Sequence, residues 1–250
     1  MYKARCILGA LSIGALAIAT AAPVVAAPTD VAADWQMNEG PDSTVMLDSS
    51  GNGLDGAISR PVDPVGPLVQ TGFDFGPDEA GLPVIGYTWP RRPPAVPPVE
   101  PYRIIQVPDN DFLDLKDATA TYTVELRYRT KEKFGNIVQK GQAQARGGQF
   151  KIQNPQGRPS CLFKGSLGRQ ATRSKQFLSD NQWHVLTCVR EPGRVEMFVD
   201  GVFENRKIGQ TGTIDNKVPV TIGGKINCDQ VETTCDYFSG DIDYVKMSIG

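Results

Sequence analysis

Apolar and polar residues alternate along several short segments of this chain, and this two-residue period limits what the chain can fold into. In residues 121–130, TYTVELRYRT, the apolar positions are Tyr122, Val124, Leu126 and Tyr128. Residues 194–204, RVEMFVDGVFE, repeat the pattern with Val195, Met197 and Val199. Because successive side chains of a strand point to opposite faces, both segments are predicted to be strands with one buried face.

Turn residues separate these runs at the spacing of hairpins. They are EPGR at 191–194, Asp200-Gly201 and Gly223-Gly224. No segment after residue 28 keeps an apolar stripe of helical period for three turns. The chain is 40% hydrophobic, which is enough to bury a core. The sequence therefore predicts an antiparallel all-β domain of the sandwich or barrel type.

The first 27 residues differ in kind from the rest. Lys3 and Arg5 precede an uncharged stretch rich in Ala and Gly, which ends in the small residues Val25-Ala26-Ala27. This order is typical of a signal peptide, and no basic stop-transfer cluster follows that would favour a membrane anchor. We expect cleavage after residue 26 or 27 and a secreted, extracellular mature chain, residues 28–250, without a membrane span.

Loss of this leader removes two bases and no acid, so the formal net charge changes from −2 to −4. A mildly acidic surface does not match nucleic acid, whose binding needs clustered basic charge. Nucleic acid is therefore excluded as a partner.

Export gives the remaining cysteines a structural meaning, because disulfides form in oxidising compartments. Four of them follow the leader: Cys161, Cys188, Cys228 and Cys235. Three pairings are possible, and the short spacing of Cys228 and Cys235 suits a small closed loop, which would leave Cys161 to pair with Cys188. A zinc site would need ligand pairs at about C-x-x-C spacing, and the sequence has none.

A proline-dense segment interrupts the strand pattern between residues 59 and 102, and it ends in WPRRPPAVPPVEPY at 89–102. Proline cannot donate to a β-ladder and is kept out of central strands. We expect a surface insertion with polyproline II character in a single domain, because residues 29–58 are too few to bury a core alone.

The single histidine, His184, follows Trp183 at the start of a predicted strand. Catalysis would need a nucleophile or carboxylate beside it, and metal binding would usually need further His or Cys ligands. The sequence shows neither a G-x-S-x-G motif nor a second histidine. His184 is therefore predicted to be structural.

Several segments together resemble laminin G-like domains of the concanavalin A-like lectin/glucanase superfamily. The core of the resemblance is DNQWHVLTCVREPGRVEMFVDGVFE at 180–204. The family order is kept by ADWQMNEG, DSSGNGLDGAI, RIIQVPDNDFLDLKDATATYTVELRYRT, NIVQKG, GGQFKIQNPQGRPSCLFKG, VTIGGK and FSGDIDYVKMSIG. The resemblance covers about residues 32–58 and 103–249.

This resemblance implies a jelly-roll β-sandwich of two curved antiparallel sheets with a Pro-rich insertion loop. In that fold Trp183 would fill the core or its rim, and His184 would fix a strand end. Arg127 stands where many relatives have Trp, and we expect it to be a solvated residue of a sheet face; an ion pair with a ligand or with Glu125 is the alternative.

Three functions are compatible with such a fold. A glucanase-type hydrolase would need two close carboxylates, but Glu125 and Glu196 lack acidic companions at the required positions of their strands, apart from Asp200, which belongs to the predicted hairpin turn. A non-catalytic module for carbohydrate or another extracellular ligand is favoured, with Tyr87, Trp89 and Tyr102 as candidate exposed aromatics. A structural or adhesive protein that binds a surface protein would leave the same sequence traces.

Calcium is the one cofactor that the resemblance suggests. Related sandwiches often hold a structural Ca²⁺ between the N-terminal loop and the last strand. The matching positions here are Asp243 in GDIDYVKM and Asp48 and Asn52 in DSSGNG. Hard oxygen donors on a flexible loop suit calcium, although DSSGNG is also a normal turn sequence.

Overall fold

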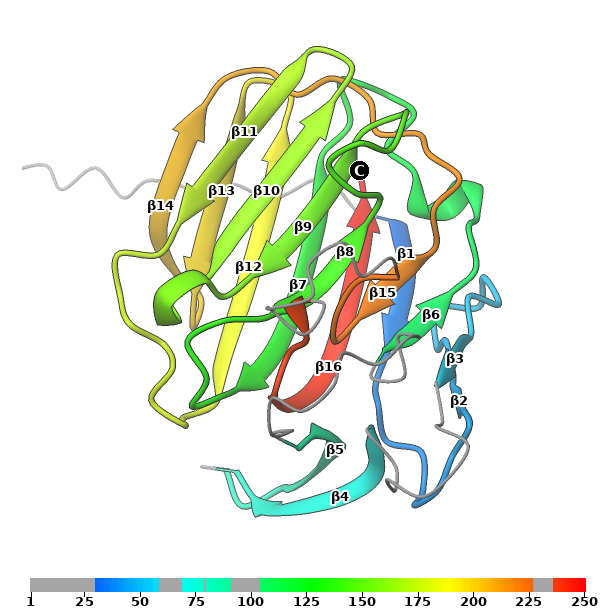
Figure 1. Cartoon of the computed structure of the whole chain (residues 1–250), viewed down its shortest axis with the longest axis vertical. Coiled ribbons are helices and arrows are strands. Elements are labelled where there is room, and N and C mark those ends of the chain that lie inside the picture. The colour runs from blue at the N-terminus through cyan, green and yellow to red at the C-terminus, as the bar shows by residue number, and fades with distance from the viewer. Residues whose placement is uncertain (1–29, 59–68, 79, 91–103, 227–235) are drawn as a thin grey trace, which may run out of the picture.

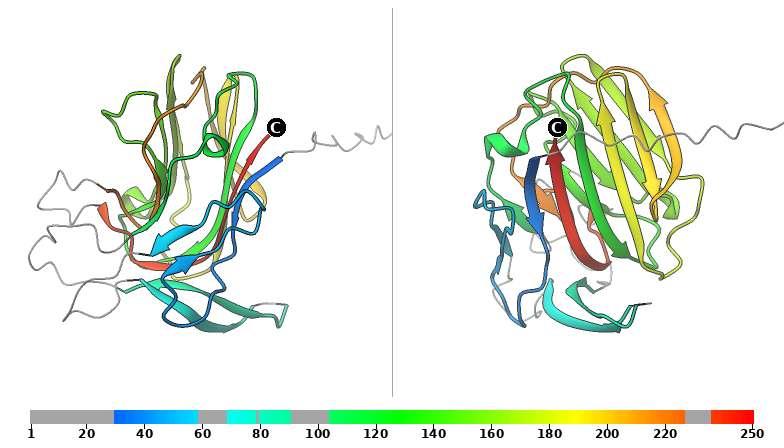
Figure 2. Two further views of the ribbon diagram at one scale, coloured as in Figure 1. Left: turned by 90° about the vertical axis from the view of Figure 1, so that its right-hand side faces the viewer. Right: turned by 180° about the vertical axis from the view of Figure 1, so that it is seen from behind.

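The computed structural model describes residues 30–58, 69–78, 80–90, 104–226 and 236–250. These residues form two antiparallel sheets that pack face to face (Figures 1 and 2). The only helical elements among them are two short 3₁₀ turns, η1 (Asp111–Leu113) and η2 (Pro155–Gly157). No helix of this part of the chain is long and apolar enough to cross a membrane. The predicted fold class, an all-β jelly-roll sandwich, is confirmed.

Sheet A holds the segments with the clearest alternation. Its order is β14, β13, β12, β7, β16, β5, β4, and β1 pairs with β16 beside β5. The strands are β1 (Asp30–Trp35), β4 (Gln70–Pro77), β5 (Pro83–Trp89), β7 (Tyr122–Arg129), β12 (His184–Glu191), β13 (Arg194–Val199), β14 (Val202–Ile208) and β16 (Gly240–Ile249).

Sheet B lies opposite and has the order β11, β10, β9, β8, β15, β6, β3, β2. The strands are β2 (Val45–Met46), β3 (Gly56–Ile58), β6 (Ile105–Val107), β8 (Asn136–Lys140), β9 (Gln149–Gln153), β10 (Ser160–Gly165), β11 (Gly168–Arg173) and β15 (Val220–Ile222).

The core lies between the sheets, where the alternation predicts it. The four apolar positions of β7 are buried, and Val195, Met197 and Val199 of β13 are buried with them. Aromatic rings from both sheets meet in the core, for example Tyr122 with Phe163 at 6.2 Å between centroids. Each such pair adds about 0.5–1.5 kcal/mol to the free energy of burial. The opposite face of sheet A, which we call the outer face, carries the polar partners of these residues.

Two strands lie within the segment 59–102, which the sequence predicts to be a surface insertion. β4 and β5 form a hairpin that extends sheet A, and β5 pairs with β16 at residues 240–242. The glycines Gly72 and Gly76 have positive φ in β4, so the strand bends where no other residue would be comfortable. Residues 59–68, 79 and 91–102 of the proline-dense segment lie outside the described residues.

Candidate functional site

Trp183 lies on the outer face of sheet A, in a stack with two arginines. The alternation of β7 turns Arg127 and Arg129 outward, and each guanidinium lies 4.9 Å from the centre of the Trp183 ring. The ring of Phe75, from the β4–β5 hairpin, meets the indole edge-on at 5.3 Å. Of the two expected positions, the core or its rim, the core is therefore wrong for Trp183. The flat guanidinium groups of Arg127 and Arg129 stack on the indole, so Trp183 has packing partners on the outer face.

The two arginines are themselves fixed by carboxylates of β16. Arg127 donates to Asp243 at 2.8 Å, and Arg129 donates to Asp241 at 2.6 Å. The register of β16 shifts between Ile242 and Tyr244, which turns Asp243 toward Arg127. Arg127 is thus paired with Asp243 rather than simply solvated or paired with Glu125, and the ion pair with a ligand stays a prediction.

His184 bridges two aspartates beside this stack. Its Nδ1 lies 2.9 Å from Asp200 Oδ2, and its Nε2 lies 3.2 Å from Asp180 Oδ1. Asp200 also accepts from the backbone N–H of Val185 at 2.8 Å. Burial would raise the pKa of Asp180, but hydrogen bonds from the Gln182 backbone and from His184 outweigh it and lower that pKa. His184 therefore ties a strand end to the Asp200-Gly201 turn.

A pocket of about 800 Å³ opens between this cluster and the β4–β5 hairpin. Its walls combine one aromatic face with charged and amide groups: Pro77, Asp78, Ala80, Arg127, Gln182, Trp183, His184 and Asp200. Of the three tryptophans, Trp35 and Trp89 are buried, whereas Trp183 is partly exposed here. An indole among hydrogen-bonding groups in an open pocket is able to hold a polyhydroxylated ring, with C–H groups on the indole and hydroxyls on the polar rim.

The aromatic residues that the sequence proposes for ligand contact do not line this pocket. Tyr87 and Trp89 are buried in the core by β5, and the Tyr87 hydroxyl donates to Glu39. Tyr102 lies outside the described residues. Tyr87 and Trp89 are buried because β5 is a strand of sheet A rather than a loop, and both occupy inward positions of that strand. Trp183, which is expected in the core or at its rim, is the aromatic side chain that faces the pocket.

The three predicted calcium ligands have partners within the protein. Asp48 accepts four hydrogen bonds, from the backbone N–H groups of Asp34, Ser50 and Leu54 and from the Ser50 hydroxyl. Asn52 donates to two carbonyls of β1, and Asp243 holds Arg127. Within the described ranges, no three His, Cys, Asp or Glu side chains converge where a metal ion could bind. Calcium binding at these residues stays a prediction, since an ion would have to replace these contacts.

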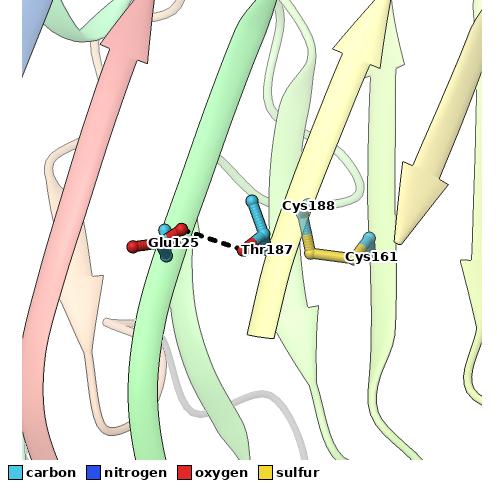
Figure 3. The surroundings of a disulfide bond; sticks show 4 residues. All are labelled: Glu125, Cys161, Thr187 and Cys188. Atoms are coloured by element: carbon cyan, nitrogen blue, oxygen red, sulfur yellow. Dashed lines mark hydrogen bonds between the residues drawn. A yellow bond between two sulfur atoms is a disulfide. The ribbon is translucent and has the colours of Figure 1, made fainter. Parts of the chain in front are cut away.

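One predicted disulfide is present. Cys161 of β10 is bonded to Cys188 of β12, with 5.8 Å between the Cα atoms, and the bond joins sheet B to sheet A (Figure 3). The pairing of Cys161 with Cys188 is confirmed. Cys228 and Cys235 lie outside the described residues.

The two glutamates that a hydrolase would have to use are engaged separately. Glu125 accepts from Thr187 at 2.9 Å, as Figure 3 shows, and from the Tyr244 hydroxyl at 3.0 Å. Glu196 pairs with Arg194 at 2.9 Å. Glu125 is opposite Thr187 and Glu196 is opposite Val189, so the glutamates lie two strands and two positions apart. That offset separates their Cα atoms by about 12 Å.

Solved structures resemble the chain at low sequence identity. Domain 4 of AbnA, a GH43 extracellular arabinanase from Geobacillus stearothermophilus in complex with arabinotriose, is 16% identical with a TM-score of 0.54, and the match covers 89% of this chain and 93% of that one. The binding domain of Paraclostridial Mosquitocidal Protein 1 is 14% identical with a TM-score of 0.55, covering 88% and 48%. Mouse laminin alpha1 domains LG4-5 are 21% identical with a TM-score of 0.45, covering 55% and 40%.

The chain thus spans less than half the length of the laminin and mosquitocidal structures. No curated protein matches it. The family model that matches residues 102–248, more than half of the chain, is the laminin G model of the concanavalin A-like lectin/glucanases superfamily. These residues include β6 to β15 and nearly all of β16, so they carry strands of both sheets and Trp183, while β1 to β5 lie outside the match. The chain belongs to the concanavalin A-like lectin/glucanases superfamily, as a laminin G-type sandwich.

Proposed function

We propose that this protein is an extracellular, non-catalytic binding module that holds a neutral oligosaccharide in the pocket beside Trp183. The observation that carries the proposal is the indole of Trp183, partly exposed in a pocket whose other walls offer Arg127, Gln182 and His184. Sugar rings present C–H groups on one face and hydroxyls at the rim. An aromatic side chain surrounded by polar groups matches both.

The charges around the pocket favour a neutral ligand. Arg127 is already paired with Asp243, and Asp78 and Asp200 add negative charge to the lining. Asp180 lies behind His184. A sulfated or uronate-rich glycan would meet more carboxylates than free cations here, and like charges at an interface cost affinity.

Two similar structures support a binding role. The arabinanase domain matches over nearly its whole length, and its structure holds arabinotriose; the mosquitocidal protein's matching region is described as its binding domain. Because both are below 20% identical, they support the shape of a binding module rather than the identity of the ligand. Arabinotriose is therefore the first probe, within a panel of neutral oligosaccharides.

Hydrolysis is not part of the proposal, because the candidate carboxylates are already bonded to other side chains of the protein. Glycosidases need two carboxyl groups free to act on the same bond, whereas Glu125 accepts from Thr187 and Tyr244 and Glu196 pairs with Arg194. Asp180 and Asp200 lie closer, but the imidazole of His184 fills the space between them. The lowered pKa of Asp180 is also the wrong direction for a general acid.

The proposed location outside the cell agrees with the cross-sheet disulfide Cys161–Cys188, since such bonds persist in oxidising compartments. The predicted leader, residues 1–27, lies outside the described residues. N-terminal sequencing of protein exported from an expression host tests it. A mature chain that starts at Ala27 or Pro28 is the expected result, and retention of Met1 contradicts it.

Isothermal titration of the folded protein with arabinotriose and with xylan- and glucan-derived oligosaccharides tests the binding. Trp183→Ala is expected to weaken binding at least about tenfold, the loss of about 1.4 kcal/mol that one stacking face supplies. Phe112→Ala is the control, because Phe112 is an exposed aromatic that lines a different pocket of about 530 Å³. Its affinity should equal that of the wild type.

Two results would overturn the proposal. A wild-type protein that binds none of these sugars would favour a structural or adhesive role instead. Release of reducing ends from the same oligosaccharides at enzyme-like rates would show that the protein is a hydrolase. Tryptophan fluorescence adds an independent signal, because Trp35 and Trp89 are buried and ligand-dependent changes should come from Trp183.

A further inference from the structure

A second aromatic group lies on the same outer face of sheet A, at its far edge. Phe198 of β13 and Phe203 of β14 meet edge-to-face, with 5.8 Å between ring centroids and 78° between ring planes. Phe203 is 49% exposed and Phe198 is partly exposed. The hairpin turn at Asp200-Gly201 connects the two strands, and Asp200 is also a wall of the pocket. The pocket and the phenylalanine pair are therefore linked by one turn.

The strand register fixes where this pair lies relative to Trp183. Phe198 is opposite Thr187 in β12 and opposite Phe203 in β14. Thr187 lies four residues after Trp183, which is about 13 Å along the strand, and the two phenylalanines lie about 5 and 10 Å farther across the sheet. The two aromatic groups are therefore separated by on the order of 15 Å, more than a single sugar ring spans.

The surface between them is held in place by strand pairing and hydrogen bonds. Val185 and Thr187 form its centre on β12, opposite Arg127 and Glu125 of β7. The Thr187 hydroxyl donates to Glu125, whose other oxygen accepts from Tyr244. Burial, followed by the charge and hydrogen bond of Glu125, raises the pKa of Tyr244, so this hydroxyl stays protonated and keeps its bond. Small β-branched side chains thus make a fixed floor between two aromatic platforms.

We infer that the Phe198–Phe203 pair is a second subsite, and that the outer face of sheet A binds one linear neutral oligosaccharide that runs from the Trp183 pocket to the β13–β14 hairpin. The inference rests on the proposed function and adds the ligand's shape to it: a chain, not a single sugar or a chain end. Stacking on separated aromatic rings is how a sheet face gains affinity with ligand length, because each ring adds its own contact.

Titration with arabinotriose and with linear arabinohexaose tests this. We expect the wild type to bind the hexaose about tenfold more tightly than the triose, the effect of one further aromatic contact. Phe203→Ala should remove this gain and leave the affinity for the triose unchanged. Ile208→Ala is the matched control, because Ile208 is 65% exposed on the same strand and belongs to neither subsite.

The results separate this inference from the function on which it rests. If the triose binds through Trp183 but the hexaose binds no better, the inference is wrong and the proposed function stands. Equal weakening of both ligands by Phe203→Ala would also overturn the inference, since it would show a general structural effect. If neither ligand binds the wild type, both fail. A wild-type dimer that Phe203→Ala converts to a monomer without any change in binding would assign the pair to self-association instead.

Discussion

Arg190 is fully buried in β12, and Asp117 acts on it through its charge rather than through a hydrogen bond. Its guanidinium donates to the Thr211 hydroxyl at 2.7 Å and to the carbonyls of Ala118, Ala120 and Gly212 at 2.8–2.9 Å. Burial lowers the pKa of Arg190, but an arginine stays charged at neutral pH. We predict that Arg190→Leu lowers the free energy of unfolding by about 3–5 kcal/mol, because buried acceptors lose their donors.

Urea denaturation measures this loss, with Arg194→Leu as the control. Arg194 lies in the same hairpin but pairs with Glu191 and Glu196 near the surface, so its loss should cost less than about 1 kcal/mol. Equal effects of the two substitutions would contradict the role assigned to Arg190. Arg190→Lys should recover only part of the stability, since a single ammonium group cannot donate to all four acceptors that the planar guanidinium reaches.

Asp48 organises the loop that the sequence suggests as a calcium site. Burial raises the pKa of its carboxyl, but hydrogen bonds from Asp34, Leu54 and Ser50 outweigh burial and lower it. A lowered folded pKa stabilises the protein above the unfolded value of about 3.9, and this stabilisation is lost as the pH falls through the folded value. Asp48→Asn should therefore cost about 1–2 kcal/mol at pH 7 and progressively less below pH 4.

Urea titrations at pH 7, 5 and 3, each with EDTA and with calcium chloride, measure this. A cost that stays constant with pH would contradict the assignment. The same data test calcium binding: a wild-type midpoint that rises with calcium, and does not rise for Asp48→Asn, would support the predicted ion.

At the scale of elements, the β4–β5 hairpin depends on a close approach to β16. A Cβ atom at Gly86 would lie 2.6 Å from the carbonyl oxygen of Ile242 and 3.2 Å from the ring of Phe75. We predict that Gly86→Ala pushes β5 away from β16, costs about 1–3 kcal/mol and weakens sugar binding, because the hairpin is one wall of the pocket. Hydrogen exchange of the β5 amides should accelerate.

Gly193→Ala is the control for this substitution, since a Cβ there meets nothing within 4 Å. It should leave exchange and binding unchanged. If Gly86→Ala also leaves both unchanged, β5 does not rely on this contact.

The same hairpin shows how far the sequence predicts this structure. The inward residues of β7 and β13 follow from local alternation, because the period of two needs no knowledge of the partner strand. β4 and β5 do not follow, since prolines and glycines around them are typical of loops and their pairing depends on β16, more than 150 positions later. Trp183 is placed by Phe75 and Arg129, which are distant in sequence, so its outward position had no local signal.

At the scale of the whole molecule, the bond between Cys161 and Cys188 is a covalent link between the two sheets. It closes a loop with a sequence separation of 27. Restricting a loop of this length in the unfolded chain stabilises the folded state by about 3–4 kcal/mol in the chain-entropy description. Replacing both cysteines with Ala should lower the free energy of unfolding by that amount and leave sugar binding at low temperature unchanged.

Chemical denaturation of the wild type, with and without reductant, measures the same link without substitution. A reduced protein as stable as the oxidised one would contradict this prediction. The second predicted pair, Cys228 with Cys235, is then tested by counting free thiols in denatured mature protein: none are expected.

The acidic balance of the whole chain leads to a prediction about binding that no single contact makes. Without the predicted leader the net charge would be −4, and two of the acids, Asp78 and Asp200, line the pocket. The electrostatic field of these charges acts only weakly on a neutral sugar. Its affinity should therefore change by less than about twofold between low and high salt. A sulfated polysaccharide such as heparin should not bind even at low salt, where charge attraction is strongest. Titrations of arabinohexaose and heparin across the same salt series check both statements. Tight heparin binding that weakens steeply with salt would mean that the exposed arginines, rather than the indole of Trp183, select the ligand.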